Sequence, residues 1–125
     1  MLAEGATLTE HFRLDEFRCR CCGAVNAEHA LSVAQALEPV RADVGPVVIL
    51  SSFRCPEQNA RAGGKLHSFH LAGLAVDILV VDDRHRFALV TALLKHGFRR
   101  LGIKDDSIHA DLGPAPVDVL WTYYH

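Results

Sequence analysis

The sequence predicts one α+β domain over residues 1–125, with a small, mostly antiparallel sheet flanked by helices. The first observation is size, because 125 residues, 50% of them hydrophobic, suffice for one modest core but not for two. The second is order, because helical and strand-like patterns follow one another without the strict alternation of a doubly wound parallel fold. The third is a succession of three short strand patterns near the C-terminal end, which favours antiparallel pairing.

The chain opens with a short segment that is expected to cover an edge of the core. Residues 8–19, LTEHFRLDEFRC, mix apolar and charged residues and predict an irregular or helical segment. The apolar side chains available for the core are Leu8, Phe12, Leu14 and Phe17. This segment is therefore expected to clasp the domain rather than to form a unit of its own.

Residues 27–45 contain the clearest helical pattern of the chain. The apolar residues that recur at helical spacing are Val33, Leu37, Val40 and Val44. Asn26 is a suitable N-cap, and a Gly-Pro pair ends the pattern. Pro39 lies inside it and predicts a kink or a break near Glu38, because proline lacks the N–H group that a helix interior requires.

The middle of the chain combines strands and helices. Residues 47–53, VVILSSF, predict a buried strand, and Pro56 can open a short helix that ends at a Gly-Gly pair. Residues 74–81 predict a second strand, and residues 83–97 predict an amphipathic helix. The residues expected on the inward face of that helix are Phe87, Val90, Leu93 and Leu94.

The C-terminal part predicts three further strands at residues 99–103, 107–112 and 119–124. Short polar or proline-rich turns at residues 104–106 and 113–116 separate them. The three strands complete the sheet of the predicted α+β domain.

Charge and hydropathy exclude two classes of partner. The net charge of −2 gives no reason to expect nucleic acid or an anionic membrane surface, since both attract basic patches. No apolar run approaches the roughly 20 residues needed to cross a bilayer. The first residues, MLAEGATLTEHF, lack a basic region followed by an apolar one, so we expect synthesis in the cytoplasm without a signal peptide. We also expect a monomer.

The four cysteines leave three alternatives open. Cys19, Cys21 and Cys22 crowd into the stretch CRCCG, and Cys55 lies far along the chain. They are reduced thiols beside a turn, or a disulfide such as Cys19 to Cys55, or ligands of a second, structural zinc ion.

Two histidines and two aspartates point to a metal centre. His70 and Asp77 flank Gly73 in a loop that leads into a strand, which lets both side chains turn to one point. A catalytic zinc ion requires three protein ligands and an open position. His109 is the best third candidate because a strand over SIHADL places His109 and Asp111 on one face. Asp111 can then accept a hydrogen bond from a ligand imidazole and fix its tautomer.

The segment SSFRCPEQNARAGGKLHSFHLAGLAVDI closely resembles the signature of the zinc D-alanyl-D-alanine carboxypeptidases and related phage endolysins, peptidase family M15. The signature consists of S-x-x-R followed by S-x-H-x-x-G-x-A-x-D. Its positions in this chain are Ser51, Arg54, Ser68, His70, Gly73, Ala75 and Asp77. The downstream IHAD resembles the third-ligand segment of the family, and HFRLDEFRC resembles the start of its small single-domain members.

The resemblance implies a fold shared with the hedgehog signalling domain, with a metal cleft over the sheet. It implies that Zn²⁺ is held by His70, Asp77 and His109. It also implies an acidic base three residues before the last histidine, which is Asp106 here, with Asp105 as a rival. Asp111 is a rival as well. Aspartates are common in turns for purely structural reasons, and only the spacing to His109 singles out Asp106.

Four further residues are expected around the centre. Arg54 is expected to bind a substrate carbonyl or carboxylate and to stabilise the developing oxyanion, although a surface ion pair with Glu57 is the structural alternative. Ser68 is expected to take part in substrate binding, and His67 to support the ligands. Trp121 is expected to line the cleft for a peptide or sugar, with a place in the core as the alternative.

The leading hypothesis is therefore a zinc metallopeptidase that hydrolyses peptidoglycan stem peptides or muropeptides, as a D,D-carboxypeptidase or an endopeptidase. The sequence does not select the bond. Without a signal peptide, such an enzyme is expected to be released or delivered to the cell wall, as a prophage-encoded enzyme would be. The alternative is a non-catalytic zinc-binding module that binds cell wall or a protein partner on the same scaffold. A cysteine-based redox or zinc-ribbon protein would leave the histidines unexplained.

Overall fold

A five-stranded sheet runs through the computed structural model, which describes residues 6–61, 69–113 and 118–123. In spatial order its strands are β1 (Ile49–Ser51), β2 (Ala75–Leu79), β4 (Ser107–Asp111), β3 (Arg100–Ile103) and β5 (Val119–Thr122). All neighbours pair antiparallel except β3 and β5, which are parallel. The helices are the 3₁₀ turn η1 (Leu14–Phe17), α1 (Ala27–Val44), α2 (Pro56–Arg61) and α3 (Asp83–Lys95). The prediction of an α+β fold with a mostly antiparallel sheet is confirmed.

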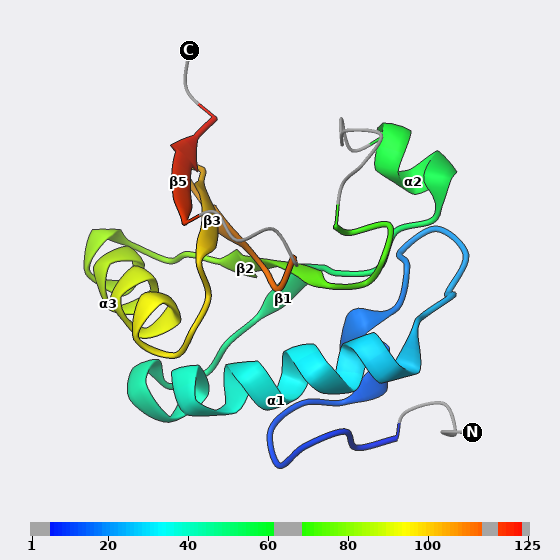
Figure 1. Cartoon of the computed structure of the whole chain (residues 1–125), viewed down its shortest axis with the longest axis horizontal. Helices are drawn as coiled ribbons and strands as arrows, with labels where there is room; N and C mark the ends of the chain where they lie inside the picture. The colour runs from blue at the N-terminus through cyan, green and yellow to red at the C-terminus, as the bar shows by residue number, and fades with distance from the viewer. Residues whose placement is uncertain (1–5, 62–68, 114–117, 124–125) are drawn as a thin grey trace.

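Alternation along the two central strands separates the core from a polar face. Val76 and Ile78 of β2, with Ile108 and Ala110 of β4, belong to the buried apolar cluster. That cluster also contains the inner faces of α1 and α3, and Figure 1 shows α1 below the sheet and α3 beside it. The intervening residues point the other way, because successive side chains of a strand face opposite sides. The second face of the sheet is thus free to carry polar chemistry.

Helix α1 begins and ends as predicted but does not break. The Asn26 side chain caps it by accepting the His29 N–H at 3.0 Å, and Gly45 ends it with a φ of 85°. The helix is continuous through Pro39, so of the kink or break expected near Glu38 the break does not occur. Proline inside a helix costs about 3 kcal/mol, and burial offsets this cost because both sides of the proline are anchored in the core. The anchoring residues are Val33, Leu37 and Val40.

Helix α3 exists as predicted, but the prediction of which residues form its inward face was partly wrong. Phe87 is 75% exposed and Leu94 is 40% exposed, whereas Leu89 and Leu93 are fully buried. Apolar residues lie on more than one side of this helix, so their periodicity does not select a single face.

Among the described residues, no helix is long and apolar enough to span a membrane.

The N-terminal segment clasps the domain as predicted. Phe12, Leu14 and Phe17 are all at most 2% exposed. The strand predicted over residues 47–53 is shorter in the structure, where β1 comprises only Ile49–Ser51. Helix α2 starts at Pro56 as expected, and the Gly-Gly pair predicted to end it lies outside the described residues.

Candidate metal centre

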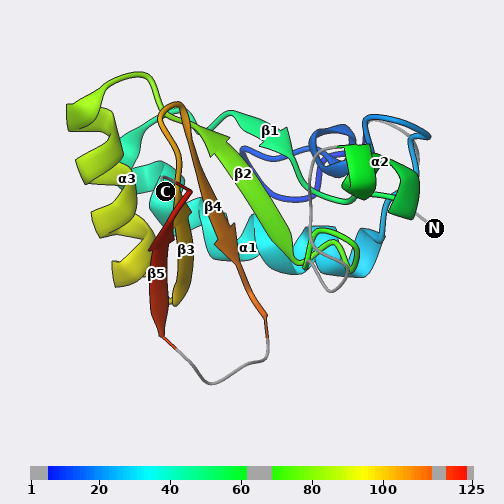
Figure 2. The ribbon, with the colours of Figure 1, turned by 90° about the horizontal axis from the view of Figure 1, so that it is seen from above.

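Strand register brings two of the predicted ligands together. Asp77 of β2 and His109 of β4 are direct partners across the antiparallel pair, which places their Cβ atoms about 5 Å apart on one face. Figure 2 shows β2 and β4 side by side. Both residues face away from the apolar core.

The third residue, His70, comes from a tight turn just before β2. Its carbonyl oxygen accepts the N–H of Arg54 at 3.0 Å and the N–H of Gly73 at 3.1 Å. Gly73 has a φ of 76°, and a Cβ there would lie 3.3 Å from the Phe53 ring. Glycine therefore lets the turn fold back against the chain and hold His70 over the sheet.

Three donor atoms converge on one point. His70 Nε2 lies 3.1 Å from Asp77 Oδ1, His109 Nδ1 lies 3.2 Å from His70 Nε2, and His109 Nδ1 lies 3.3 Å from Asp77 Oδ1. Tetrahedral ligands held about 2.0 Å from a zinc ion are about 3.3 Å apart. The residues present therefore fit zinc in both chemistry and spacing, and we call them the donor triad. They are the three residues that the sequence selected.

Hydrogen bonds at the opposite ring nitrogens fix which nitrogen faces the centre. The Ser52 carbonyl oxygen lies 2.7 Å from His70 Nδ1, so Nδ1 carries the proton and the Nε2 lone pair is available. On the other ring, Asp111 Oδ2 lies 2.7 Å from His109 Nε2, which leaves Nδ1 for the metal. Such partners orient metal-binding imidazoles and raise their basicity.

Burial and neighbouring charges shift two of these groups in opposite directions. Burial on its own raises the pKa of Asp77, but hydrogen bonds from His109 and His70 hold it well below the usual aspartate value. Burial lowers the pKa of His109, but its contacts with Asp111 and Asp77 raise it above the usual value. The contacts around Asp77 thus favour its ionised carboxylate, the form that a metal ion requires.

Arg54 lies against the donor triad rather than on the surface. Its Nη2 bonds Asp77 Oδ2 at 2.8 Å, and the whole residue is 8% exposed. Its other contacts are Nε to Ser51 Oγ at 3.1 Å and Nη1 to Asn59 Oδ1 at 3.4 Å. The alternative ion pair with Glu57 is not among the salt bridges of the described residues. Arg54 thus orients the carboxylate that would bind the metal.

Trp121 lines the site, and a glycine makes room for it. Gly102 pairs with His109 on one side and with Trp121 on the other. A Cβ at Gly102 would lie 2.6 Å from the indole ring. Because this position has no side chain, the rings of His109 and Trp121 approach to 5.4 Å between centroids. Trp121 is half-buried and stands beside His109 of the donor triad rather than in the core.

Sequence reasoning missed Arg100, which contacts both Phe69 and Trp121. We call these three residues the aromatic wall. The Arg100 guanidinium lies 5.2 Å from the ring centroid of Phe69 and 5.5 Å from that of Trp121, and its Nε bonds Asp111 Oδ1 at 3.0 Å. Arg100 and Asp111 are direct partners across β3 and β4, a signal that appears only once the register is known.

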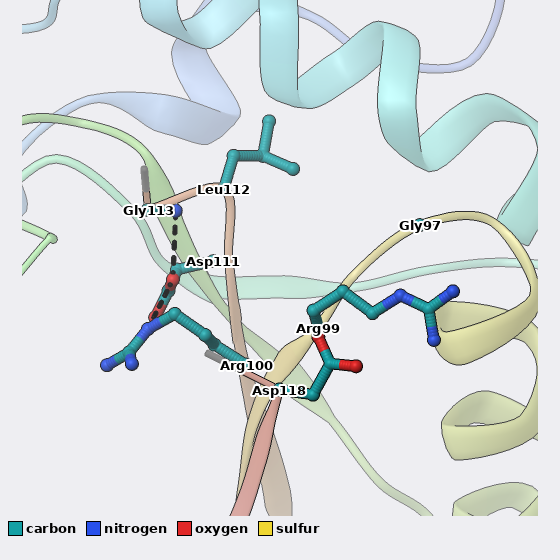
Figure 3. A pocket seen from close by; sticks show the side chains of 7 residues that line it. All are labelled: Gly97, Arg99, Arg100, Asp111, Leu112, Gly113 and Asp118. Carbon is teal, nitrogen blue, oxygen red and sulfur yellow. Dashed lines mark hydrogen bonds and ion pairs between the residues drawn. The ribbon is translucent and has the colours of Figure 1, made fainter. Parts of the chain in front are cut away.

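A pocket of about 270 Å³ borders this wall. Figure 3 shows Arg100 and the Gly113 N–H both bonded to Asp111 at its edge. The lining residues are Gly97, Arg99, Arg100, Asp111, Leu112, Gly113 and Asp118, and they include no member of the donor triad. The pocket therefore adjoins the metal centre without containing it.

Asp106 is not brought to the donor triad. It is exposed in the turn before β4, and its backbone oxygen accepts the Val80 N–H at 2.8 Å. Among the described residues, its carboxylate is not within the 4.8 Å that groups His70, Asp77 and His109. His67 and Ser68 lie outside the described residues.

The region that carries the donor triad matches a known protein family. A family model described as peptidase M15 matches residues 10–111. The matched range contains Arg54, the whole donor triad and Asp111. No curated protein matches this chain.

Proposed function

This chain belongs to the peptidase M15 family, and on that premise we propose that it is a zinc metallopeptidase that hydrolyses peptidoglycan stem peptides. Membership implies a peptidase with a peptide substrate. The observation that carries the proposal is the donor triad, whose three donor atoms lie 3.1–3.3 Å apart. The tautomers of its two histidines are fixed by hydrogen bonds at their opposite ring nitrogens. Zinc held there would supply a nucleophile from water at neutral pH and a Lewis acid for the scissile carbonyl.

Arg54 supports catalysis through its charge and its remaining donors. A guanidinium has five N–H groups, and in the described part of the chain three of its hydrogen bonds go to protein acceptors. The remaining N–H groups can bind the carbonyl oxygen or terminal carboxylate of a peptide. Because this charge is buried next to the metal ligands, it would act strongly on an oxyanion that develops during attack.

The aromatic wall supports recognition of the substrate. Trp121, Phe69 and the guanidinium of Arg100 form a continuous stack beside His109. Flat apolar surfaces with a cation between them suit the faces of a peptide backbone or a sugar ring. We include Ser68 in substrate binding on the motif alone.

We keep Asp106 as the proposed proton acceptor on its spacing to His109 alone. In the structure it lies in the exposed turn before β4, outside the donor triad. The matched test is Asp106→Asn beside Asp105→Asn, since both residues are exposed in the same turn. The first variant is expected to keep its zinc and lose turnover, whereas the second keeps both. Equal activity in the two variants would place the base elsewhere.

The function is tested with defined muropeptides, including one that ends in D-Ala-D-Ala, incubated with zinc-loaded protein and analysed by mass spectrometry. Loss of one alanine identifies a carboxypeptidase, and cleavage elsewhere identifies an endopeptidase. His109→Ala is expected to abolish turnover. His85→Ala is the control, because that ring accepts the Val81 N–H outside the donor triad. Intact substrates in the presence of zinc-loaded protein would favour a non-catalytic zinc-binding module.

A further inference from the structure

We propose that Cys19, Cys22 and Cys55 form a second metal site that holds a structural zinc ion through three thiolates. Their sulfur atoms lie within 4.8 Å of one another, and all are free thiols in the structure. Sulfur ligands about 2.3 Å from a tetrahedral zinc ion are about 3.8 Å apart, so three sulfur atoms within 4.8 Å of one another can occupy three of its four positions. The proposal does not depend on the peptidase activity, because it involves none of the residues of the donor triad.

Local backbone structure makes Cys19 and Cys22 a chelating pair. They have the C-x₂-C spacing that structural zinc sites use. The Gly23 N–H bonds the Cys19 carbonyl at 2.9 Å, and the Cys19 N–H bonds the Ala24 carbonyl at 2.8 Å. Gly23 has a φ of 78°, which glycine adopts without strain. The chain therefore reverses tightly and returns Cys22 to Cys19.

Cys55 reaches this turn from a distant part of the chain. Its backbone N–H donates to Cys19 Sγ at 3.3 Å, and the Gln58 N–H points at Cys55 Sγ at 3.5 Å. Donors directed at sulfur stabilise negative charge on it, as thiolate ligands require. Cys19 is only 3% exposed, whereas Cys22 is exposed, so a cation could enter from solvent.

The neighbouring Cys21 is arranged differently and supplies a control. It is exposed and accepts a hydrogen bond from Arg61 Nη2 at 2.6 Å, and it is not part of the three-sulfur group. One of two adjacent thiols thus joins the cluster and the other does not. Replacing each in turn separates metal binding from general loss of a thiol.

A metal here would fasten the N-terminal turn to the segment that carries Arg54. Cys55 directly follows Arg54, whose guanidinium bonds Asp77. The backbone N–H of Phe53 already bonds the carbonyl of Phe17 at 3.2 Å, so the two segments are in register without the metal. Zinc would add a second link between the two segments, through Cys55 on one side and Cys19 and Cys22 on the other.

The test counts metal in the reduced full-length chain after it has been stripped with chelator and reloaded with Zn²⁺. Elemental analysis is expected to give two zinc ions per chain for the wild type and for Cys21→Ser, and one for Cys22→Ser and for His109→Ala. Cys22→His, which keeps a ligand at this position, is expected to restore two, so a folding defect in the serine variant is distinguishable.

Cobalt supplies a second readout that is independent of activity. Co²⁺ bound to thiolates absorbs in the near ultraviolet through sulfur-to-metal charge transfer, and nitrogen and carboxylate ligands give no such band. The band is expected in His109→Ala and absent in Cys22→Ser. One zinc ion in the wild type with no charge-transfer band would overturn the proposal. In protein purified without reductant, an intact mass two hydrogens lower, with only two thiols left to react, would also overturn the proposal, because these results mark a disulfide.

Discussion

Asp111 shows how one side chain can determine which nitrogen of His109 faces a metal. Its carboxylate is fully buried, with Oδ2 on His109 Nε2 and Oδ1 on Arg100 Nε and the Gly113 N–H. Asp111→Asn replaces one acceptor oxygen by a donor, so at least one of these bonds is lost. We expect zinc affinity to fall roughly 10- to 100-fold, as is typical when such a partner is removed. Competition with a chromogenic chelator measures it, and unchanged affinity would mean that Asp111 does not set the tautomer.

Gly102 is a second position where a single atom matters. In Gly102→Ala the new Cβ would lie 2.6 Å from the Trp121 ring, so the indole must move away from His109. We expect a loss of about 1–3 kcal/mol in stability, as overpacking typically causes. The fluorescence spectrum is also expected to change, and the signal is specific because the chain has one tryptophan. An unchanged spectrum in a folded variant would contradict the placement of Trp121 in this wall.

At the scale of elements, Glu38 joins the N-terminal segment to α1. Its carboxylate accepts hydrogen bonds from Thr9 Oγ1 at 2.6 Å and the His11 N–H at 2.8 Å, and it pairs with His11 Nδ1 at 2.7 Å. Burial raises the pKa of Glu38, but the contacts with Thr9 and His11 lower it below its ordinary value. These contacts occur on the helix segment next to Pro39, which they help to hold in place.

A carboxyl whose pKa is lowered by folding stabilises the fold above its unfolded pKa and loses that contribution as pH falls through the folded value. Wild-type stability is therefore expected to decline below the ordinary glutamate pKa of about 4.3. Glu38→Gln is expected to cost about 1 kcal/mol at pH 7, given its partial exposure, and to decline less in acid. Thermal unfolding at pH 7 and at a pH below the ordinary glutamate pKa checks this. Glu10→Gln is the control, because the Glu10 side chain is 84% exposed. Parallel pH profiles for wild type and Glu38→Gln would show that Glu38 is not the source of the stability lost in acid.

Elements differ in how much their sequence predicts. In β4 the alternation of apolar and polar residues has one solution, so His109 and Asp111 could be placed on a common face in advance. In α3 the apolar residues surround much of the helix, and tertiary packing selected Leu89 and Leu93 over Phe87. In α1 the rule against interior proline was overridden, because core burial on both sides of Pro39 stabilises one continuous helix.

At the scale of the whole molecule, the fold separates two tasks between the faces of one sheet. Helices α1 and α3 cover one face with apolar side chains, and the donor triad lies on the other. Cross-strand neighbours complete the site, such as Arg100 beside Asp111 and Gly102 beside Trp121. These pairings depend on register between strands far apart in sequence, which a local pattern does not contain, so they could not be predicted from it.

Because the donor triad joins β2, β4 and the turn before β2, metal binding should stabilise the entire domain. A ligand at 100 times its Kd adds about 2.7 kcal/mol to the free energy of unfolding, which for a domain of this size corresponds to a rise of about 10 °C in Tm. We expect this rise when Zn²⁺ is added to stripped Cys22→Ser protein, in which the triad is the one left intact of the two proposed sites. Adding His109→Ala in the same background should abolish the rise. Calorimetry measures both, and an equal rise in the double variant would show that zinc stabilises the fold from somewhere other than the sheet face that carries His109.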